Sequence, residues 1–299
     1  MRKLVIFVCL LFVCQAGCQK PGPLTVEPPP DSPSGGVTLI VTPVSNTDTS
    51  ITVNPVDSVG VLPTEQTTYS GLLLVNSVKY DNGHGTFSVA YASAYVGDRN
   101  RPLVVNGKIA GYYGIDLMPF TASPLRIGGI PMIRYPYRIH IGSRDTTFGS
   151  IYRAVFASLQ PKFSYDWDDP QPDTTRLIGF KDPVVTPDSL RVLAPVGGSV
   201  HSRAKQIELR WIGNGNLVII ISTYNPFTGK SRPILQLQPT VNTGKAVIEP
   251  RVLALLPATK NYVFTFIIAN RFERPLLGFS KDRILEQAAS VYNSYLQIQ

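Results

Sequence analysis

Alternation of apolar and polar residues with a period of two dominates the chain from about residue 69 onward, which is typical of β-strands with one face against a core. Turn-forming pairs such as Asn106-Gly107 interrupt the alternation, as expected between the strands of hairpins. In the clearest strand, residues 131–142, Pro136 cannot donate a hydrogen bond to a neighbouring strand, so we expect an edge strand there. Its side chains divide into one face with Ile133, Tyr135, Tyr137, Ile139 and Ile141 and an opposite face with Arg134, Pro136, Arg138 and His140.

A second series of strand-like segments runs from about residue 190 to the carboxyl terminus. Residues 206–211 and 262–268 alternate, whereas residues 217–221 are apolar on both faces, which indicates a strand at the centre of a sheet. For the last segment we expect a short helical turn near residues 281–287 and then a final strand from about Ala289, because a seven-stranded sandwich needs its last strand. The helical spacing is that of Ile284, Leu285, Ala288, Tyr292 and Tyr295.

The two series predict an all-β protein with two β-sandwich-like domains, one over residues 64–165 and one over residues 189–299. Residues 166–188 are rich in Pro and Asp and are interpreted as a linker between the domains. Residues 18–63 are rich in Pro, Ser and Thr and predict an extended tether, in which VTLIVTP and SITVNP are either short strands or more of the tether.

The first 17 residues have the features of an export signal. Arg2 and Lys3 precede an apolar stretch that ends at Cys14, and this stretch is too short to span a bilayer permanently. The sequence Gln15-Ala16-Gly17-Cys18 resembles a bacterial lipoprotein signal, in which the Cys becomes the acylated first residue of the mature protein. The alternative is an ordinary signal peptide with an incidental Cys18.

The positions of the cysteines favour acylation of Cys18. All three cysteines of the chain lie within its first 18 residues, so no disulfide framework is expected in the mature domains. The resemblance implies that a membrane is a partner through lipidated Cys18 and that the protein belongs to the bacterial cell envelope, at the outer membrane.

The second domain resembles a fibronectin type III or related bacterial immunoglobulin-like domain over about residues 190–298. The resemblance rests on ELRW at 208–211 and on LLPATKNYVFTFIIAN at 255–270. In that family a Trp on the second strand packs beneath a Tyr that closes the corner before the sixth strand, and Trp211 and Tyr262 occupy these places. The resemblance implies that both residues belong to a structural core, and it implies no catalysis.

Composition and charge narrow the classes of partner. The chain has 28 Lys and Arg against 20 Asp and Glu, a formal net charge of +8. The basic residues form no compact run, and an exported protein does not meet nucleic acid, so we expect no nucleic-acid partner.

One acidic cluster surrounds Trp167. Clustered carboxylates in a loop are ligands that Ca²⁺ prefers, and paired carboxylates can also hydrolyse glycosides. A regular calcium loop also needs a glycine and a later bidentate Glu, which this segment lacks, so a solvated loop is the main interpretation and Ca²⁺ the alternative. The cluster consists of Asp166, Asp168, Asp169 and Asp173.

Aromatic side chains are the remaining lead to a function. Exposed Tyr or Trp rings can stack on sugars, and Tyr135, Tyr137 and Trp167 are the candidates. Arg134 and Arg138, on the opposite face of the strand that carries the two tyrosines, are candidates to contact an anionic sugar or a lipid phosphate, with a solvated edge strand as the main interpretation. Most tyrosines on β-strands are half-buried with the hydroxyl at water, so the main interpretation is that these rings belong to the core, and a sugar-stacking surface is the alternative.

The three histidines, His84, His140 and His201, are far apart in sequence, and no G-x-S-x-G segment is present. We therefore predict no enzyme but a non-catalytic binding or scaffolding module with a protein or glycan partner. The alternatives are a carbohydrate-binding protein and a carbohydrate- or peptidoglycan-active lipoprotein.

Overall fold

The computed structural model describes residues 24–26, 37–44, 51–52, 69, 71–105, 108–114, 125–141, 144–168, 183–276 and 279–299. Strands make up nearly all of the regular structure in these residues, and helix α3 (Pro250–Leu253) is a single turn. The predicted all-β, sandwich-like fold is therefore confirmed. Within the same residues, no helix has the length and hydropathy needed to cross a bilayer.

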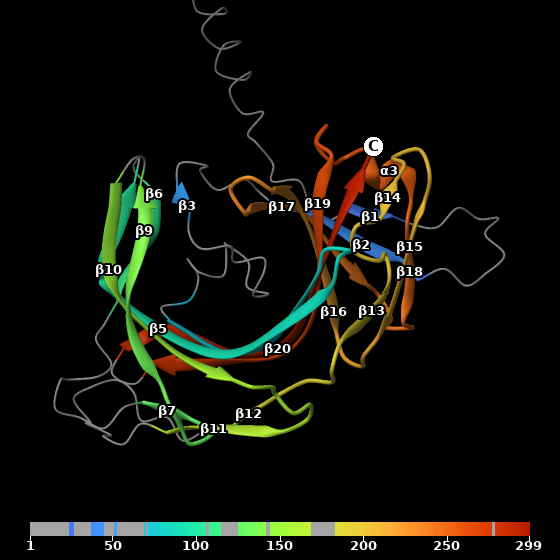
Figure 1. Cartoon of the computed structure of the whole chain (residues 1–299). Helices are drawn as coiled ribbons and strands as arrows, with labels where there is room; N and C mark the ends of the chain where they lie inside the picture. The colour runs from blue at the N-terminus through green and yellow to red at the C-terminus, as the bar shows by residue number, and fades with distance from the viewer. Residues whose placement is uncertain are drawn as a thin grey trace, which may run out of the picture.

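One 13-stranded sheet forms the frame of the molecule. It bends into a U, with β9 and β10 in one arm, β16 and β17 in the other, and β5 and β20 crossing the floor between them (Figure 1). Eleven strands run from one edge to the other in the order β1 (Leu24–Val26), β2 (Leu39–Pro43), β17 (Lys230–Pro239), β16 (Leu217–Asn225), β19 (Asn261–Leu276), β20 (Phe279–Ile298), β4 (Gly71–Asp81), β5 (Thr86–Val105), β10 (Arg144–Phe156), β9 (Ile133–Ile141) and β3 (Ile51–Thr52). Two further strands pair beside this path: β6 (Lys108–Gly114) with β5, and β14 (Val200–His201) with β20.

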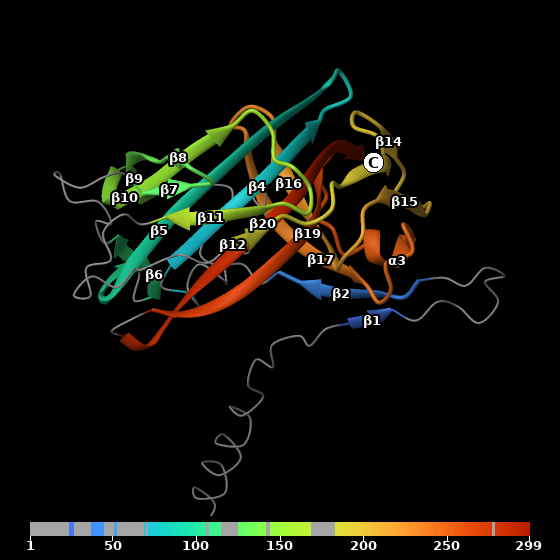
Figure 2. The same ribbon diagram turned by 90° about the horizontal axis from the view of Figure 1, so that it is seen from below.

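Two small sheets cover the outer face of the U. The first consists of β13 (Arg191–Ala194), β15 (Ile207–Ile212) and β18 (Lys245–Ile248), and it packs on the arm that contains β16 and β19. The second consists of β12 (Pro183–Val185), β11 (Ser164–Asp168), β7 (Arg126–Ile127) and β8 (Ile130–Pro131). It lies across β4, β5 and β20 when the molecule is seen from below (Figure 2).

Each small sheet encloses a hydrophobic core against the long sheet. The carboxyl-terminal core contains Trp211 and lies beneath β13, β15 and β18. The amino-terminal core contains Trp167 and lies beneath β7, β11 and β12. Strand β20 contributes to both, with Tyr292, Leu296 and Ile298 in the carboxyl-terminal core and Ile284 and Ala288 in the amino-terminal core.

Strand β20 also joins the two predicted domains into one sheet. It belongs to the segment 189–299, yet it pairs in parallel with β4 of the segment 64–165. Residues 166–188, interpreted from the sequence as a linker, include most of β11 and all of β12, and residues 169–182 lie outside the described residues. The two units therefore share a sheet instead of being joined only through a linker.

The turn between β4 and β5 packs closely on the segment after β13. The Asp81 carboxylate accepts hydrogen bonds from the backbone N–H of Gly197 (3.0 Å) and from the Tyr292 hydroxyl (3.1 Å). A Cβ at Gly197 would lie 2.3 Å from Asp81 Oδ1, a distance that real Cβ atoms do not reach. This contact holds the end of the amino-terminal unit against the carboxyl-terminal unit.

Trp211 and Tyr262, which carry the family resemblance, are buried, with exposed fractions of 3% and 0%. Trp211 Nε1 donates to Asn242 Oδ1 (2.8 Å), and the Tyr262 hydroxyl donates to the carbonyl of Pro257 at the corner before β19. In this half of the molecule, a sheet of three strands, β13-β15-β18, faces the four strands β17-β16-β19-β20.

The helical turn expected near residues 281–287 is wrong, because β20 is continuous from Phe279 to Ile298. Every residue from 284 to 294 is buried, since β20 lies between β19 and β4 and both of its faces are covered. Because neither face is open to solvent, the sequence of this strand lacks the period of two that marks a half-exposed strand. The strand expected at residues 217–221 is central, between β17 and β19.

Part of the predicted tether belongs to the folded sheet. Strand β2 pairs with β17, and its Leu39 and Val41 are buried in the carboxyl-terminal core. The SITVNP segment supplies β3, which pairs with β9 at Ile141 and His140. Strand β9 is therefore next to the edge of the sheet, and Pro136 lies where β3 does not reach. The signal segment, residues 1–17, and Cys18 lie outside the described residues.

Candidate functional site

The inner face of the U brings together side chains from β5, β9 and β10. Arg153 of β10 is paired with Ser93 of β5 and with Ile133 of β9, so these three residues lie on one face. The next residue, Tyr152, is paired with Ala94 and lies in the amino-terminal core on the outer face. The alternation within each strand thus separates an inner row from a core row.

Large apolar side chains remain exposed on this inner face. Phe87 and Val89 come from β5, Ile133 and Tyr135 from β9 and Val155 from β10; their exposed fractions are 57%, 40%, 59%, 44% and 72%. Together with Arg153 we call these residues the inner patch. Tyr80 of β4 stacks on Phe87 with a centroid separation of 4.6 Å and extends the apolar surface toward β4.

Three half-buried tyrosines lie beside the inner patch. The Tyr95 and Tyr137 rings are 4.9 Å apart, and Asn76 Nδ2 lies 3.5 Å from the Tyr91 hydroxyl, to which it donates. Burial raises the pKa of Tyr91 and of Tyr137 to about 12, and it raises the pKa of Tyr95 further. All three are therefore neutral hydrogen-bonding groups at physiological pH.

Among the sequence candidates, Tyr135 and Tyr137 share the inner face. The Arg153 guanidinium lies 6.0 Å from the centre of the Tyr135 ring, within cation–π range. Arg134 lies on the opposite face of β9, where its Nε donates to Ser150 Oγ (2.8 Å), and nothing is described of the Arg138 side chain. Among the described side chains that β5, β9 and β10 place on this face, Arg153 is thus the cation, and the sequence analysis did not single it out.

Trp167 is not available as a stacking surface for a ligand. Its exposed fraction is 1%, and it belongs to the amino-terminal core. The alternation in β11 places Tyr165 and Trp167 inward and Asp166 outward. Of the two interpretations of Trp167, the burial of its side chain therefore supports the core and not the alternative of a sugar-stacking surface.

The acidic cluster is only partly described. Asp166 is exposed on β11 and is paired in the sheet with Pro183, while Asp168 is paired with Arg126 of β7. Asp169 and Asp173 lie outside the described residues. In the described part of the chain no three His, Cys, Asp or Glu side chains gather as metal ligands would.

A Ser–His pair occurs next to β14, at Ser199 and His201. The Ser199 hydroxyl donates to the carbonyl of Val196 (2.6 Å), and its oxygen lies 2.8 Å from His201 Nε2. Which of these two groups donates to the other depends on the tautomer of His201. The contacts link the turn at Val196 to β14, and burial lowers the pKa of His201.

A second surface feature is an open pocket of about 870 Å³ at one end of the carboxyl-terminal sandwich. On β16 the core-facing row Leu217, Ile219 and Ile221 continues with Thr223, and on β17 the partner of Thr223 is Arg232. A bulge at Ile234 shifts the register at this point. We call this cavity the end pocket, since the core row becomes polar where the sandwich opens.

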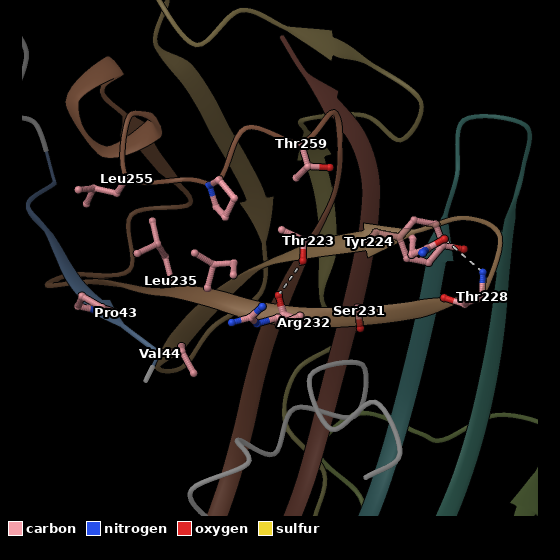
Figure 3. A pocket seen from close by; sticks show the side chains of 13 residues that line it. Pro43, Val44, Thr223, Tyr224, Thr228, Ser231, Arg232, Leu235, Leu255 and Thr259 are labelled. Carbon is pink, nitrogen blue, oxygen red and sulfur yellow. Dashed lines mark hydrogen bonds between the residues drawn. The ribbon is translucent and has the colours of Figure 1, made fainter. Parts of the chain in front are cut away.

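The opposite wall of the end pocket comes from the segment after α3. Leu255 and Thr259 lie above the strand pair, which carries Thr223, Arg232 and Leu235 (Figure 3). Arg203 fixes this wall, because its guanidinium donates to the carbonyls of Leu256 (2.9 Å) and Thr259 (3.1 Å) and to the Tyr262 hydroxyl (2.9 Å). The sequence analysis missed this pocket; a Thr at a core-facing position after an apolar run was the available signal.

Comparison with known proteins gives no match: no family model, no curated protein and no solved structure is similar to this chain. The inner patch and the end pocket are the features from which a function can be argued.

Proposed function

We propose that this protein is a lipid-anchored component of the bacterial envelope, at the outer membrane, and that it acts as a non-catalytic binding module. The observation that carries the proposal is the inner patch, with five large apolar side chains that are each at least 40% exposed on one face of one sheet. Soluble proteins rarely leave such side chains gathered on a surface unless something binds there.

The composition of the inner patch fits a protein partner. Aromatic residues and arginine are enriched at the centres of protein–protein interfaces, and the patch combines Phe87, Tyr135 and Arg153 with aliphatic side chains. The patch lies on a sheet that is held from behind by the amino-terminal core, so its backbone is positioned before a partner arrives.

The strand arrangement of the carboxyl-terminal half supports a fibronectin type III or bacterial immunoglobulin-like domain as its origin. Three strands face four, and the Tyr262 hydroxyl closes the corner before β19 through Pro257. Domains of this architecture commonly serve as binding modules and spacers at cell surfaces, and their fold alone implies no chemistry.

The anchor is tested by Cys18→Ser in a bacterium that processes lipoproteins. We expect the variant to leave the membrane fraction and to lose labelling by radioactive palmitate, since one sulfur carries the acyl chains. Cys14→Ser, in the same signal segment, is the matched control and should remain in the membrane. Retention of the Cys18→Ser protein in membranes would contradict lipid anchoring.

The binding surface is tested with a photo-crosslinking amino acid at position 155 of the full chain, in the native host. We expect a discrete protein adduct that is lost when Ile133→Ser is added and kept when Ile109→Ser is added. Ile109 is a control of similar exposure (50% against 59%) that lies on β6, away from the patch. An adduct indifferent to Ile133→Ser, or the lack of any adduct, would count against a protein partner at this face.

Carbohydrate binding is the second function that a specific observation favours. Tyr135 is 44% exposed with the Arg153 guanidinium 6.0 Å from its ring, so a sugar could stack on the ring and bond to the cation. A glycan array probed with the full chain and with Tyr135→Ala separates the two functions, because only carbohydrate binding predicts array signals that depend on Tyr135.

A further inference from the structure

Three turn segments lie together at one end of the carboxyl-terminal sandwich. The hairpin between β16 and β17 is at this end, because Thr223 near the end of β16 pairs with Tyr262 near the start of β19. The corner before β19 and strand β14 are beside it, because the end of β20 pairs with β14 and the backbone N–H of Ile298 donates to the carbonyl of Lys260 (2.9 Å). Figure 1 shows α3, β14 and the end of the chain together at the top of this arm. We call the three segments the end rim: residues 196–205, 225–232 and 254–260.

Phe227 lies at the tip of the hairpin between β16 and β17, and its side chain is 96% exposed. Asn225 orders the turn, because its Oδ1 accepts from the backbone N–H groups of Phe227 (3.0 Å) and Thr228 (3.3 Å), and its carbonyl accepts from that of Gly229 (2.9 Å). Gly229 has a φ of 66°, a conformation that suits glycine. The fold therefore holds a large apolar ring in solvent on an ordered turn, outside both cores.

Three aliphatic side chains of the end rim are exposed as well. Leu255, at the corner before β19, is 48% exposed, and Val196 and Val200, in the segment that leads into β14, are 60% and 58% exposed. Apolar side chains gathered at one end of a molecule mark a contact surface for a protein or a membrane. The side chains of the end rim belong to separate turns, and the fluid interface of a bilayer accommodates separate protrusions. A protein partner instead needs a continuous patch from which water is excluded, so the end rim fits lipid better.

The charge of the end rim favours an anionic bilayer. Its three segments contain no Asp or Glu, and Glu249, just before α3, is paired with Arg251 (2.6 Å). Lys205 and Lys260 are exposed. Every contact described for the Arg203 guanidinium is with a neutral group, so its charge also remains. Anionic headgroups attract Lys and Arg at a membrane surface, while apolar side chains beside them enter the interface.

We propose that the end rim is a contact surface for an anionic bilayer, in which Phe227 enters the interface while Lys205 and Lys260 lie among the headgroups. This surface is separate from the inner patch, which lies on β5, β9 and β10. The contact also goes beyond a lipid anchor, because it fixes which end of the folded sheet faces the membrane.

The first strand is directed toward the same end. Strand β2 runs toward the end rim along β17, with its last residue, Pro43, opposite Leu235. Strand β1 pairs antiparallel with β2, so Leu24 is nearer the end rim than Val26 is. The amino-terminal end of β1, which leads back to Cys18 in the sequence, thus points toward the membrane contact. This step alone rests on the proposed acylation of Cys18.

Tryptophan fluorescence of the full chain tests the proposal, with Phe227→Trp and Val241→Trp as a matched pair. Val241 is also an exposed apolar residue (62%), but it follows the opposite end of β17. The vesicles contain phosphatidylglycerol and phosphatidylcholine with brominated acyl chains, which quench a tryptophan that enters the bilayer. We expect the emission of Phe227→Trp to shift to shorter wavelength and to be quenched, and the emission of Val241→Trp to stay unchanged. Trp167 and Trp211 are buried and give the same background in both proteins.

This comparison separates the contact from the anchor. Both variants share residues 1–18, so binding through that segment is the same in both. Cys18→Ser, added to each variant, lowers the amount of bound protein if the anchor exists. The difference between positions 227 and 241 should persist in the protein that remains bound, so failure of the anchor and failure of the end-rim contact give different results.

The same reporter tests the charge of the lipid and of the end rim. We expect less quenching of Phe227→Trp on vesicles of brominated phosphatidylcholine alone, because anionic headgroups attract the lysines. Adding Lys260→Gln should also lower the quenching on anionic vesicles. Lys245→Gln is the matched control and should not, since Lys245 is an exposed lysine at the start of β18, away from the end rim.

Three results would overturn the proposal: equal quenching of Phe227→Trp and Val241→Trp, equal quenching of Phe227→Trp with and without phosphatidylglycerol, or no effect of Lys260→Gln. A short-wavelength emission of Phe227→Trp without lipid would also overturn it, because protein, from this chain or from a second copy, would then cover the hairpin. All of these substitutions except Cys18→Ser are at exposed positions, and circular dichroism checks the fold of each variant.

Discussion

At the scale of single residues, polar groups inside this fold are held by dense local contacts. The Asp81 carboxylate accepts from two backbone N–H groups and from the Tyr292 hydroxyl, and Arg203 donates to the carbonyl oxygens of the corner before β19. For the tyrosines of the inner face, Tyr91, Tyr95 and Tyr137, burial is the main cause of the raised pKa, because it favours the neutral, protonated hydroxyl over the charged phenolate. These tyrosines make the stability of the fold sensitive to high pH.

We predict that the free energy of unfolding falls as the pH rises from 10 to 12. An unfolded tyrosine loses its proton near pH 10, whereas burial raises the pKa of Tyr91, Tyr137 and Tyr292 in the folded protein to about 12. Between these values the unfolded state binds fewer protons than the folded state, so stability decreases with pH. Tyr91 and Tyr137 should each contribute a loss of about 2 kcal/mol by pH 12, and Tyr292 a smaller loss of the same sign. Urea denaturation followed by circular dichroism at pH 8, 10 and 11 measures the slope.

Tyr137→Phe is the variant that isolates one of these groups. It keeps an aromatic ring beside Tyr95 and removes the hydroxyl that titrates. Its stability should fall less steeply above pH 10 than that of the unchanged protein, whatever its stability at pH 8. Parallel slopes for the two proteins would show that Tyr137 ionises as readily in the folded state as in the unfolded state.

At the scale of elements, the sequence predicts strands that have one exposed face better than strands that have none. The alternation over residues 133–137 correctly separates Tyr135 and Tyr137 from Arg134. Strand β20 has neighbours on both sides and core on its outer face, so its buried positions include Glu286, Gln287 and Asn293 as well as apolar side chains. Without a regular alternation, the spacing of the apolar residues in this segment fits a helix as well as it fits a strand. In the structure the segment is a strand.

The candidate site could be predicted only in part for the same reason. Alternation places Tyr135 on a face of β9, but it does not say which strand lies beside β9. Arg153 joins the inner patch because β10 pairs with both β9 and β5, and Phe87 and Val89 join it across β5. Register between distant strands depends on tertiary packing, which single-strand periodicity does not contain. The end pocket depends likewise on a corner that brings residues 255–259 over β17.

At the scale of the whole molecule, one long strand couples two cores. Removing β20 from the sheet would take Ile284 and Ala288 from the amino-terminal core and Leu296 and Ile298 from the carboxyl-terminal core. It would also expose the whole parallel edge of β4, from Gly71 to Asp81. Neither unit can therefore lose β20 without exposing apolar surface and unpaired backbone groups in the other.

We predict that the two cores unfold in a single transition. The chain has two tryptophans, Trp167 in the amino-terminal core and Trp211 in the carboxyl-terminal core, so Trp211→Phe and Trp167→Phe each leave a fluorescent reporter in one core. Within each variant, the urea midpoint from fluorescence should equal the midpoint from far-ultraviolet circular dichroism, which follows all strands at once. Comparing two probes within one variant removes any stability change that the substitution causes. Separate midpoints would mean that one unit keeps its sheet after the other has lost β20, and the shared strand would then be a contact between independent domains.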